Sequence, residues 1–96
     1  SHYNLIMKFK VEKHPAVESE ISNLEITQRV IESEGIEFVK VKAIQNKIFE
    51  IKSNELRSLF KYKEGKIIVI GVVFVKKSQK TPKETIKLAK QRLKEV

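Results

Sequence analysis

The stretch KIIVIGVVFVKK, residues 66–77, decides how this chain folds. From Ile67 to Val75 it is apolar at odd and even positions alike, which predicts a central strand buried on both faces of a sheet. Gly71 interrupts the run and is expected to mark a β-bulge or the close approach of another backbone. The two lysines at its end begin the most basic part of the chain.

The segments before this strand predict its partners. Residues 55–62, ELRSLFKY, have strand character, and Glu64-Gly65 is a hairpin turn signal between the two strands. The pattern turns β-like from Ile36, with Phe38 and Val39, and residues 47–53, KIFEIKS, alternate and predict a third strand, joined through Ser53-Asn54. The three segments are expected to form a meander.

The N-terminal part predicts one strand followed by helix. Residues 4–12, NLIMKFKVE, read as the strand, which His14-Pro15 ends. Apolar residues then recur at helical spacing from Ala16 to about Glu34. A break at Ile26-Thr27 would divide this region into two helices that cover the sheet.

Thr81-Pro82-Lys83-Glu84 predicts the start of a last helix over residues 82–95. Thr81 is expected to cap this helix, with Pro82 at its first position and Glu84 completing a capping box. Four lysines then follow one another at spacings of four, three and four residues along one side of the helix: Lys83, Lys87, Lys90 and Lys94.

Length and composition limit the classes of protein. The 96 residues predict a single domain over 1–96, of which Ser1-His2 is expected to be a non-native remnant. There is no cysteine for a disulfide or a thiolate metal site, and neither a membrane span nor a secretory signal is recognisable. We therefore expect a cytoplasmic protein without a metal or other cofactor.

Charge is distributed very unevenly. Residues 1–50 carry 7 Lys and Arg against 8 Glu, a net charge of −1, whereas residues 51–96 carry 13 against 4, a net charge of +9. Such asymmetry suggests a polyanionic partner, most simply nucleic acid, although lysine-rich surfaces also serve solubility alone. The chain contains no Asp, which argues against a two-metal nuclease.

The second half of the chain resembles a known family. Four segments carry the likeness: Phe49-Glu50-Ile51-Lys52, Arg57-Ser58-Leu59-Phe60, the run FVKKSQKTP from Phe74 to Pro82, and Glu84 through Ala89 to Arg92. They are similar to the "E-L-R", "R-x-L-Y/F", "F-x-K-K-T-Q-K-T-P" and "E-I-x-x-A-x-x-R" motifs of RelE superfamily toxins, especially the HigB-like, phage-associated branch. In the first half only the order of elements matches.

The resemblance implies an mRNA-cleaving toxin that usually acts on the ribosome and is neutralised by a cognate antitoxin, commonly a helix-turn-helix DNA-binding protein. It implies an α+β fold with a twisted, mostly antiparallel sheet of about four strands. An N-terminal helix or helix pair packs on one face, and a helix ends the chain. RNA would lie across the opposite, basic face.

Metal-free RNA cleavage needs cations that stabilise a pentacoordinate phosphorane. By resemblance, the catalytic candidates are Arg57, Lys76, Lys77 and Lys52, with Arg57 as the main phosphate contact because its fork suits phosphate oxygens. The candidates for RNA binding are Lys80, Tyr62, which would stack on a base, and the four helix lysines Lys83, Lys87, Lys90 and Lys94.

Each candidate also has a structural interpretation. Arg57 would pair with a glutamate across the sheet, Lys76 and Lys77 would protect a hydrophobic strand from aggregation, and Tyr62 would pack across strands. Lys52 and the helix lysines would simply be solvated.

The chain also departs from the family. Val72 and Val73 stand where many relatives carry a histidine, and nothing singles out Glu55 or Glu64 as a base. A RelE-fold protein that binds RNA, the ribosome or a partner without cleavage is therefore the main alternative. A small DNA-binding domain is a weaker one.

Overall fold

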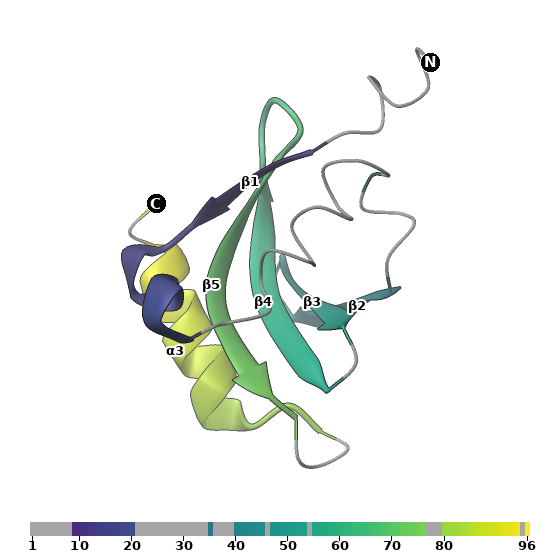
Figure 1. The fold of residues 1–96 in the computed structure, drawn as a ribbon, viewed down its shortest axis with the longest axis vertical. Helices are drawn as coiled ribbons and strands as arrows, with labels where there is room; N and C mark the ends of the chain where they lie inside the picture. The colour runs from purple at the N-terminus through teal and green to yellow at the C-terminus, as the bar shows by residue number, and fades with distance from the viewer. Residues whose placement is uncertain are drawn as a thin grey trace.

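Five strands form one mixed sheet in the order β1-β5-β4-β3-β2. The computed structural model describes residues 9–20, 35, 40–45, 47–53, 55–76, 80–94 and 96. Its elements are β1 (Lys10–Lys13), the 3-10 helix η1 (Pro15–Glu20), β2 (Lys40–Gln45), β3 (Ile48–Ser53), β4 (Leu56–Lys63), β5 (Ile67–Val75) and α3 (Lys83–Leu93). Figure 1 shows α3 lying along β5, while β2 and β3 form the opposite side of the sheet. The fold is α+β, with one strand more than the four expected.

The central position of β5 confirms the prediction made from its apolar run. It pairs with β1 on one side and β4 on the other, and Ile68 to Val73 are all buried. The register shifts from Leu59 opposite Val72 to Phe60 opposite Ile70, so Gly71 is the extra residue of a β-bulge. A Cβ on Gly71 would lie 2.8 Å from Leu93 Cγ. The close approach therefore comes from a side chain of α3 rather than from another backbone.

The strand β2 is not among the strands that the sequence predicts. It pairs antiparallel with β3, and its register shifts between Ala43 and Gln45. Val41 packs into one side of the sheet and Ile44, three residues later, into the other, so the partly buried apolar residues of β2 do not recur at every second position. A bulge destroys the two-residue alternation by which a strand is recognised in sequence.

The first strand runs parallel to its partner. Among the described residues of this segment, Lys10–Lys13 pair in parallel with Ile67 to Ile70, whereas the other three pairings of the sheet are antiparallel. Of the strand predicted over 4–12, residues 4–8 lie outside the described residues. The same holds for residues 21–34 of the predicted helix, whose described beginning, Pro15–Glu20, is a 3-10 helix. The N-terminal helix packed on the sheet therefore stays a prediction.

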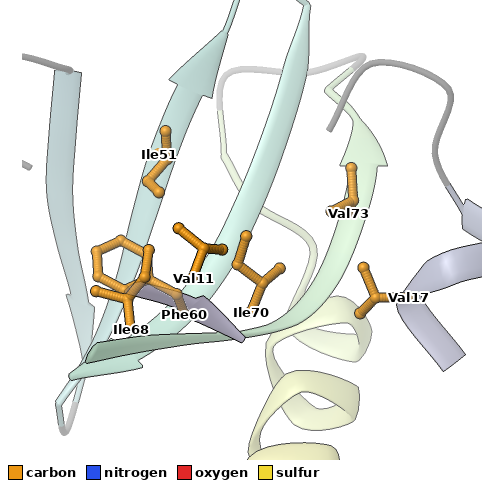
Figure 2. Packing of buried hydrophobic residues seen from close by; sticks show 7 residues of the cluster. All are labelled: Val11, Val17, Ile51, Phe60, Ile68, Ile70 and Val73. Carbon is orange, nitrogen blue, oxygen red and sulfur yellow. The ribbon is translucent and has the colours of Figure 1, made fainter. Parts of the chain in front are cut away.

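Two hydrophobic clusters occupy the two faces of the sheet. One contains Val17 of η1, and Figure 2 shows it against side chains from four strands; its buried members are Val11, Val17, Ile51, Phe60, Ile68, Ile70 and Val73. The other lies under α3 and consists of Ile48, Leu59, Val69, Val72, Ala89 and Leu93. The strand β5 supplies both clusters, because successive residues point to opposite faces and the bulge at Gly71 shifts this alternation by one residue. Ile68, Ile70 and Val73 therefore lie in the first cluster, and Val69 and Val72 in the second.

The last helix is present where it was predicted, but it begins one residue later, at Lys83, and neither Thr81 nor Glu84 caps it. Pro82 is the N-cap residue and no side chain caps the helix; the Thr85 and Ile86 N–H groups donate to the Pro82 carbonyl. The Thr81 hydroxyl instead donates to the carboxylate of Glu50. Water can satisfy an exposed helix N–H, whereas a buried carboxylate needs a donor from the protein, so Glu50 takes the hydroxyl.

Hydrogen bonds from the sheet and an ion pair with η1 hold the C-terminal end of α3. Lys61 Nζ donates to the Leu93 and Val96 carbonyls at 2.7 and 2.8 Å, where a cation suits the helix C-terminus. Arg92 donates to the Gly71 carbonyl at 3.0 Å and pairs with Glu20 at 2.9 Å. Among the residues described, no helix is long and apolar enough to cross a membrane.

Candidate nucleic-acid interface

A row of cations crosses three neighbouring strands on the face that carries α3. Lys40 of β2 lies opposite Lys52 of β3, and Lys52 lies opposite Arg57 of β4. Directly opposite side chains have Cβ atoms about 4.5–5.5 Å apart, and like charges in such positions destabilise a sheet. This sheet cation row, Lys40, Lys52 and Arg57, therefore has the arrangement expected of a surface that receives an anion.

Beside this row, a buried carboxylate joins four parts of the chain. Glu50 is fully buried, although its strand β3 lies next to the edge strand β2. Its Oε1 lies 3.9 Å from Arg57 Nε and 3.8 Å from Lys76 Nζ, and its Oε2 accepts the hydrogen bond from Thr81. We call these residues, Glu50, Arg57, Lys76 and Thr81, the Glu50 cluster.

The Glu50 cluster limits what its two cations can contact. The side chains of Arg57 and Lys76 are only 15% and 10% exposed. Arg57 also donates from Nη1 to the Leu56 carbonyl at 2.8 Å. Two cations around one carboxylate leave a net positive charge, so the cluster attracts an anion. Glu50 meanwhile holds both cations in place. The pairing of Arg57 with a glutamate across the sheet, one of the two interpretations of this residue, is present here.

A second group of cations borders a groove beside α3. One depression of about 280 Å³ is lined by Gln45, Lys83, Ile86, Lys87 and Lys90. Another of about 450 Å³ is lined by Lys47, Ile48, Lys61, Lys90, Leu93 and Lys94. Lys90 lines both, so the four predicted lysines all border this pair of depressions, with Gln45 lining the first and Lys47 the second. We call the pair the groove beside α3.

The four lysines of α3 suit an extended polyanion. We call Lys83, Lys87, Lys90 and Lys94 the α3 lysine row. At 1.5 Å rise per residue it spans roughly 16 Å. Lys47 joins it from the hairpin between β2 and β3, with a positive φ of 68°. No local pattern selects Lys47 as a site residue, because its role depends on α3 lying opposite that hairpin.

The remaining candidates do not all reach this face. Tyr62 packs edge-on against Phe49 and Phe60, at ring-centroid distances of 5.0 and 5.3 Å. It therefore lies on the opposite face of the sheet from both cation groups, with 42% of its surface exposed. Lys80 is exposed just before Thr81. Lys77 lies outside the described residues.

Glu50, like Lys40 and Lys47, belongs to this face although the sequence patterns do not single it out. It stands in one of the motif segments, yet the glutamates that come into question as bases are Glu55 and Glu64, and both are exposed. A signal is present: Glu50 follows Ile48 by two residues and so shares the face that Ile48 buries under α3. A charged residue on a buried face needs a partner of opposite charge.

The fold and this face define an α+β protein whose five-stranded mixed sheet and last helix carry a basic surface. Residues 16–94 match the family model described as Phage derived protein Gp49-like (DUF891), and the chain belongs to this family. No curated protein matches the chain.

Proposed function

We propose that this protein is an mRNA-cleaving endoribonuclease toxin of the RelE type, with RNA lying across the face of the sheet cation row and the α3 lysine row. The observation that carries the proposal is the strand register. It sets Lys40 directly opposite Lys52, and Lys52 directly opposite Arg57. This arrangement costs stability unless an anion offsets it. Membership of the Gp49-like family is consistent with a toxin-like protein.

In the proposed reaction the RNA supplies its own nucleophile. The 2′-hydroxyl oxygen bonds to the adjacent phosphorus and gives its proton to water. The bond from phosphorus to the 5′-oxygen breaks while that oxygen takes a proton from water, leaving a 2′,3′-cyclic phosphate and a 5′-hydroxyl. Arg57 stabilises the charge that develops on the phosphorane, and Lys76, Lys77 and Lys52 are the further catalytic candidates. The α3 lysine row and Lys80 hold the flanking backbone.

The proposal includes the partners that the family resemblance implies. The mRNA substrate would be met on the ribosome, and a cognate antitoxin, a helix-turn-helix DNA-binding protein, would neutralise the toxin. The groove beside α3 supports a polyanionic partner, because lysines line both of its depressions without a glutamate among the described lining residues.

A second candidate function is binding of RNA or the ribosome without cleavage. The burial of Arg57 and Lys76 beside Glu50 favours it, since a cation held by a carboxylate is less available to a developing negative charge. His14 is also engaged within its own turn at the end of β1, where its Nδ1 accepts the Ala16 N–H at 3.1 Å.

Inducing the untagged protein in cells and mapping mRNA ends tests the proposal. New 5′-hydroxyl ends within translated messages, together with growth arrest, are expected, and coexpression of the neighbouring gene should suppress both. Growth arrest without new ends would favour the second candidate. Absence of growth arrest, of new ends and of RNA binding would contradict both functions.

A further inference from the structure

A single buried carboxylate contacts both ends of the connection between β5 and α3. Lys76 is the first residue after β5, and Thr81 lies two residues before α3. Both reach Glu50 of β3, Lys76 by an ion pair of 3.8 Å and Thr81 by a hydrogen bond. The same carboxylate lies 3.9 Å from Arg57, which places all three contacts on one residue.

The position of Glu50 in β3 relates these contacts to the basic face. Ile48, two residues earlier on the same face, lines the groove, and Lys52, two residues later, is the middle of the sheet cation row. Thr81 precedes Lys83, the first lysine of the α3 row. Glu50 therefore links the strand that carries one cation group to the start of the helix that carries the other.

We infer that Glu50 is a positioning residue for RNA binding: it holds Arg57, Lys76 and the start of α3 so that the two cation groups face the RNA together. Glu50 is fully buried and does not touch RNA itself. The inference rests on the proposed function, which supplies RNA as the ligand. The contacts between Glu50 and its three partners do not depend on what this face binds.

The direction in which one substitution changes RNA affinity distinguishes a positioning role of Glu50 from an effect of net charge. Glu50→Gln keeps the size of the side chain and an oxygen that accepts from Thr81, and it removes one negative charge. Removing a negative charge by itself strengthens binding to a polyanion. Lost positioning weakens it, because Arg57 and Lys76 are no longer directed by the carboxylate. A weakening therefore cannot come from the change in net charge.

The experiment measures binding of a fluorescent single-stranded RNA over a range of salt concentrations. Glu50→Gln is expected to bind about tenfold more weakly, with a shallower salt slope because fewer phosphates are contacted at once. Glu64→Gln, the same charge change in the exposed hairpin turn, should bind as well as the wild type or slightly better. In an Arg57→Gln background, Glu50→Gln should change binding less than about twofold, since its main target is gone.

Thr81→Val provides a second variant if Glu50→Gln does not fold. It removes only the hydroxyl, and it should weaken RNA binding about threefold, because the remaining contacts of Glu50 persist. Thr85→Val, the same change within α3, should leave binding within the error of the measurement. Equal or tighter binding by folded Glu50→Gln, or by Thr81→Val, would overturn the positioning role.

The interaction between Glu50 and Lys76 can be tested without RNA. In urea unfolding, Glu50→Gln and Lys76→Met should be strongly non-additive. If the wild type binds no RNA but this coupling is present, the proposed function fails and the tie between Glu50 and Lys76 stands. If the two substitutions are additive, the positioning role is wrong even if RNA binds.

Discussion

The sheet cation row and the α3 lysine row bring positive charge to one face in different ways. In the sheet, neighbouring strands set Lys40, Lys52 and Arg57 directly opposite one another, and the innermost cation is 15% exposed and paired with a buried carboxylate. On α3 the lysines follow one another at intervals of about 4.5–6 Å along the axis. The spacing between neighbouring cations is similar in the two rows, so the difference lies in their surroundings. The sheet row ends in a cation paired with a buried carboxylate, whereas the α3 lysines border open depressions.

This difference suggests a division of tasks. A cation held in place by a buried carboxylate suits charge that develops at one phosphate during a reaction. A row of lysines beside open depressions suits the repeated phosphates of an extended backbone. Substitutions in the sheet row should therefore affect the rate of cleavage, and substitutions in the α3 row should affect affinity.

The largest expected effect is that of Arg57→Ala. Loss of this guanidinium should cost on the order of 3 kcal/mol of transition-state stabilisation, a decrease of ~100-fold in the rate of RNA cleavage. Arg57→Lys should restore only part of it, because a point charge cannot reproduce the fork. Single-turnover cleavage, with circular dichroism to confirm folding, measures the effect. If folded Arg57→Ala cleaves RNA at the wild-type rate, the proposed division between a sheet row for cleavage and an α3 row for affinity is wrong.

A smaller effect is expected from the double change Lys87→Gln/Lys90→Gln. Two lost phosphate contacts should lower the salt slope of RNA binding by about 1.4 and weaken binding about tenfold at physiological salt. The cleavage rate at saturating RNA should not change. The matched control is Lys10→Gln/Lys13→Gln, with the same loss of charge on β1, where the two lysines pair with Glu12 and Glu18 instead.

For the double variant, an effect no larger than that of the β1 control would mean that total charge, and not the groove, determines affinity. A lower cleavage rate at saturating RNA would mean that the α3 row takes part in the chemistry as well.

The smallest expected effect concerns stability. Lys52 lies between two other cations, so Lys52→Gln should raise the free energy of unfolding by about 0.5 kcal/mol while it weakens RNA binding. Lys63→Gln, on the neighbouring strand, removes an ion pair of 3.4 Å with Glu12 and should lower stability slightly. Urea unfolding at low salt measures both, and a loss of stability in Lys52→Gln would refute the idea that the row is electrostatically strained.

Local patterns in the sequence are sufficient for the elements whose partners are close in the chain. They predict the apolar run of β5, the Glu64-Gly65 turn before it and the helix after Pro82, and Gly65 has the positive φ of 84° that such a turn requires. The concentration of positive charge in the second half follows from composition alone. These features depend on neighbouring residues, which periodicity and turn chemistry report directly.

Only the tertiary structure decided where distant segments meet. It determined that β1 pairs in parallel with β5, that a bulged β2 completes the sheet, and that Tyr62 faces away from the lysines. It also brought Glu50, Arg57, Lys76 and Thr81 together from β3, β4 and both ends of the connection to α3. The physical reason is register: a one-residue shift in strand pairing moves every side chain to the opposite face, and no local pattern specifies that long-range alignment.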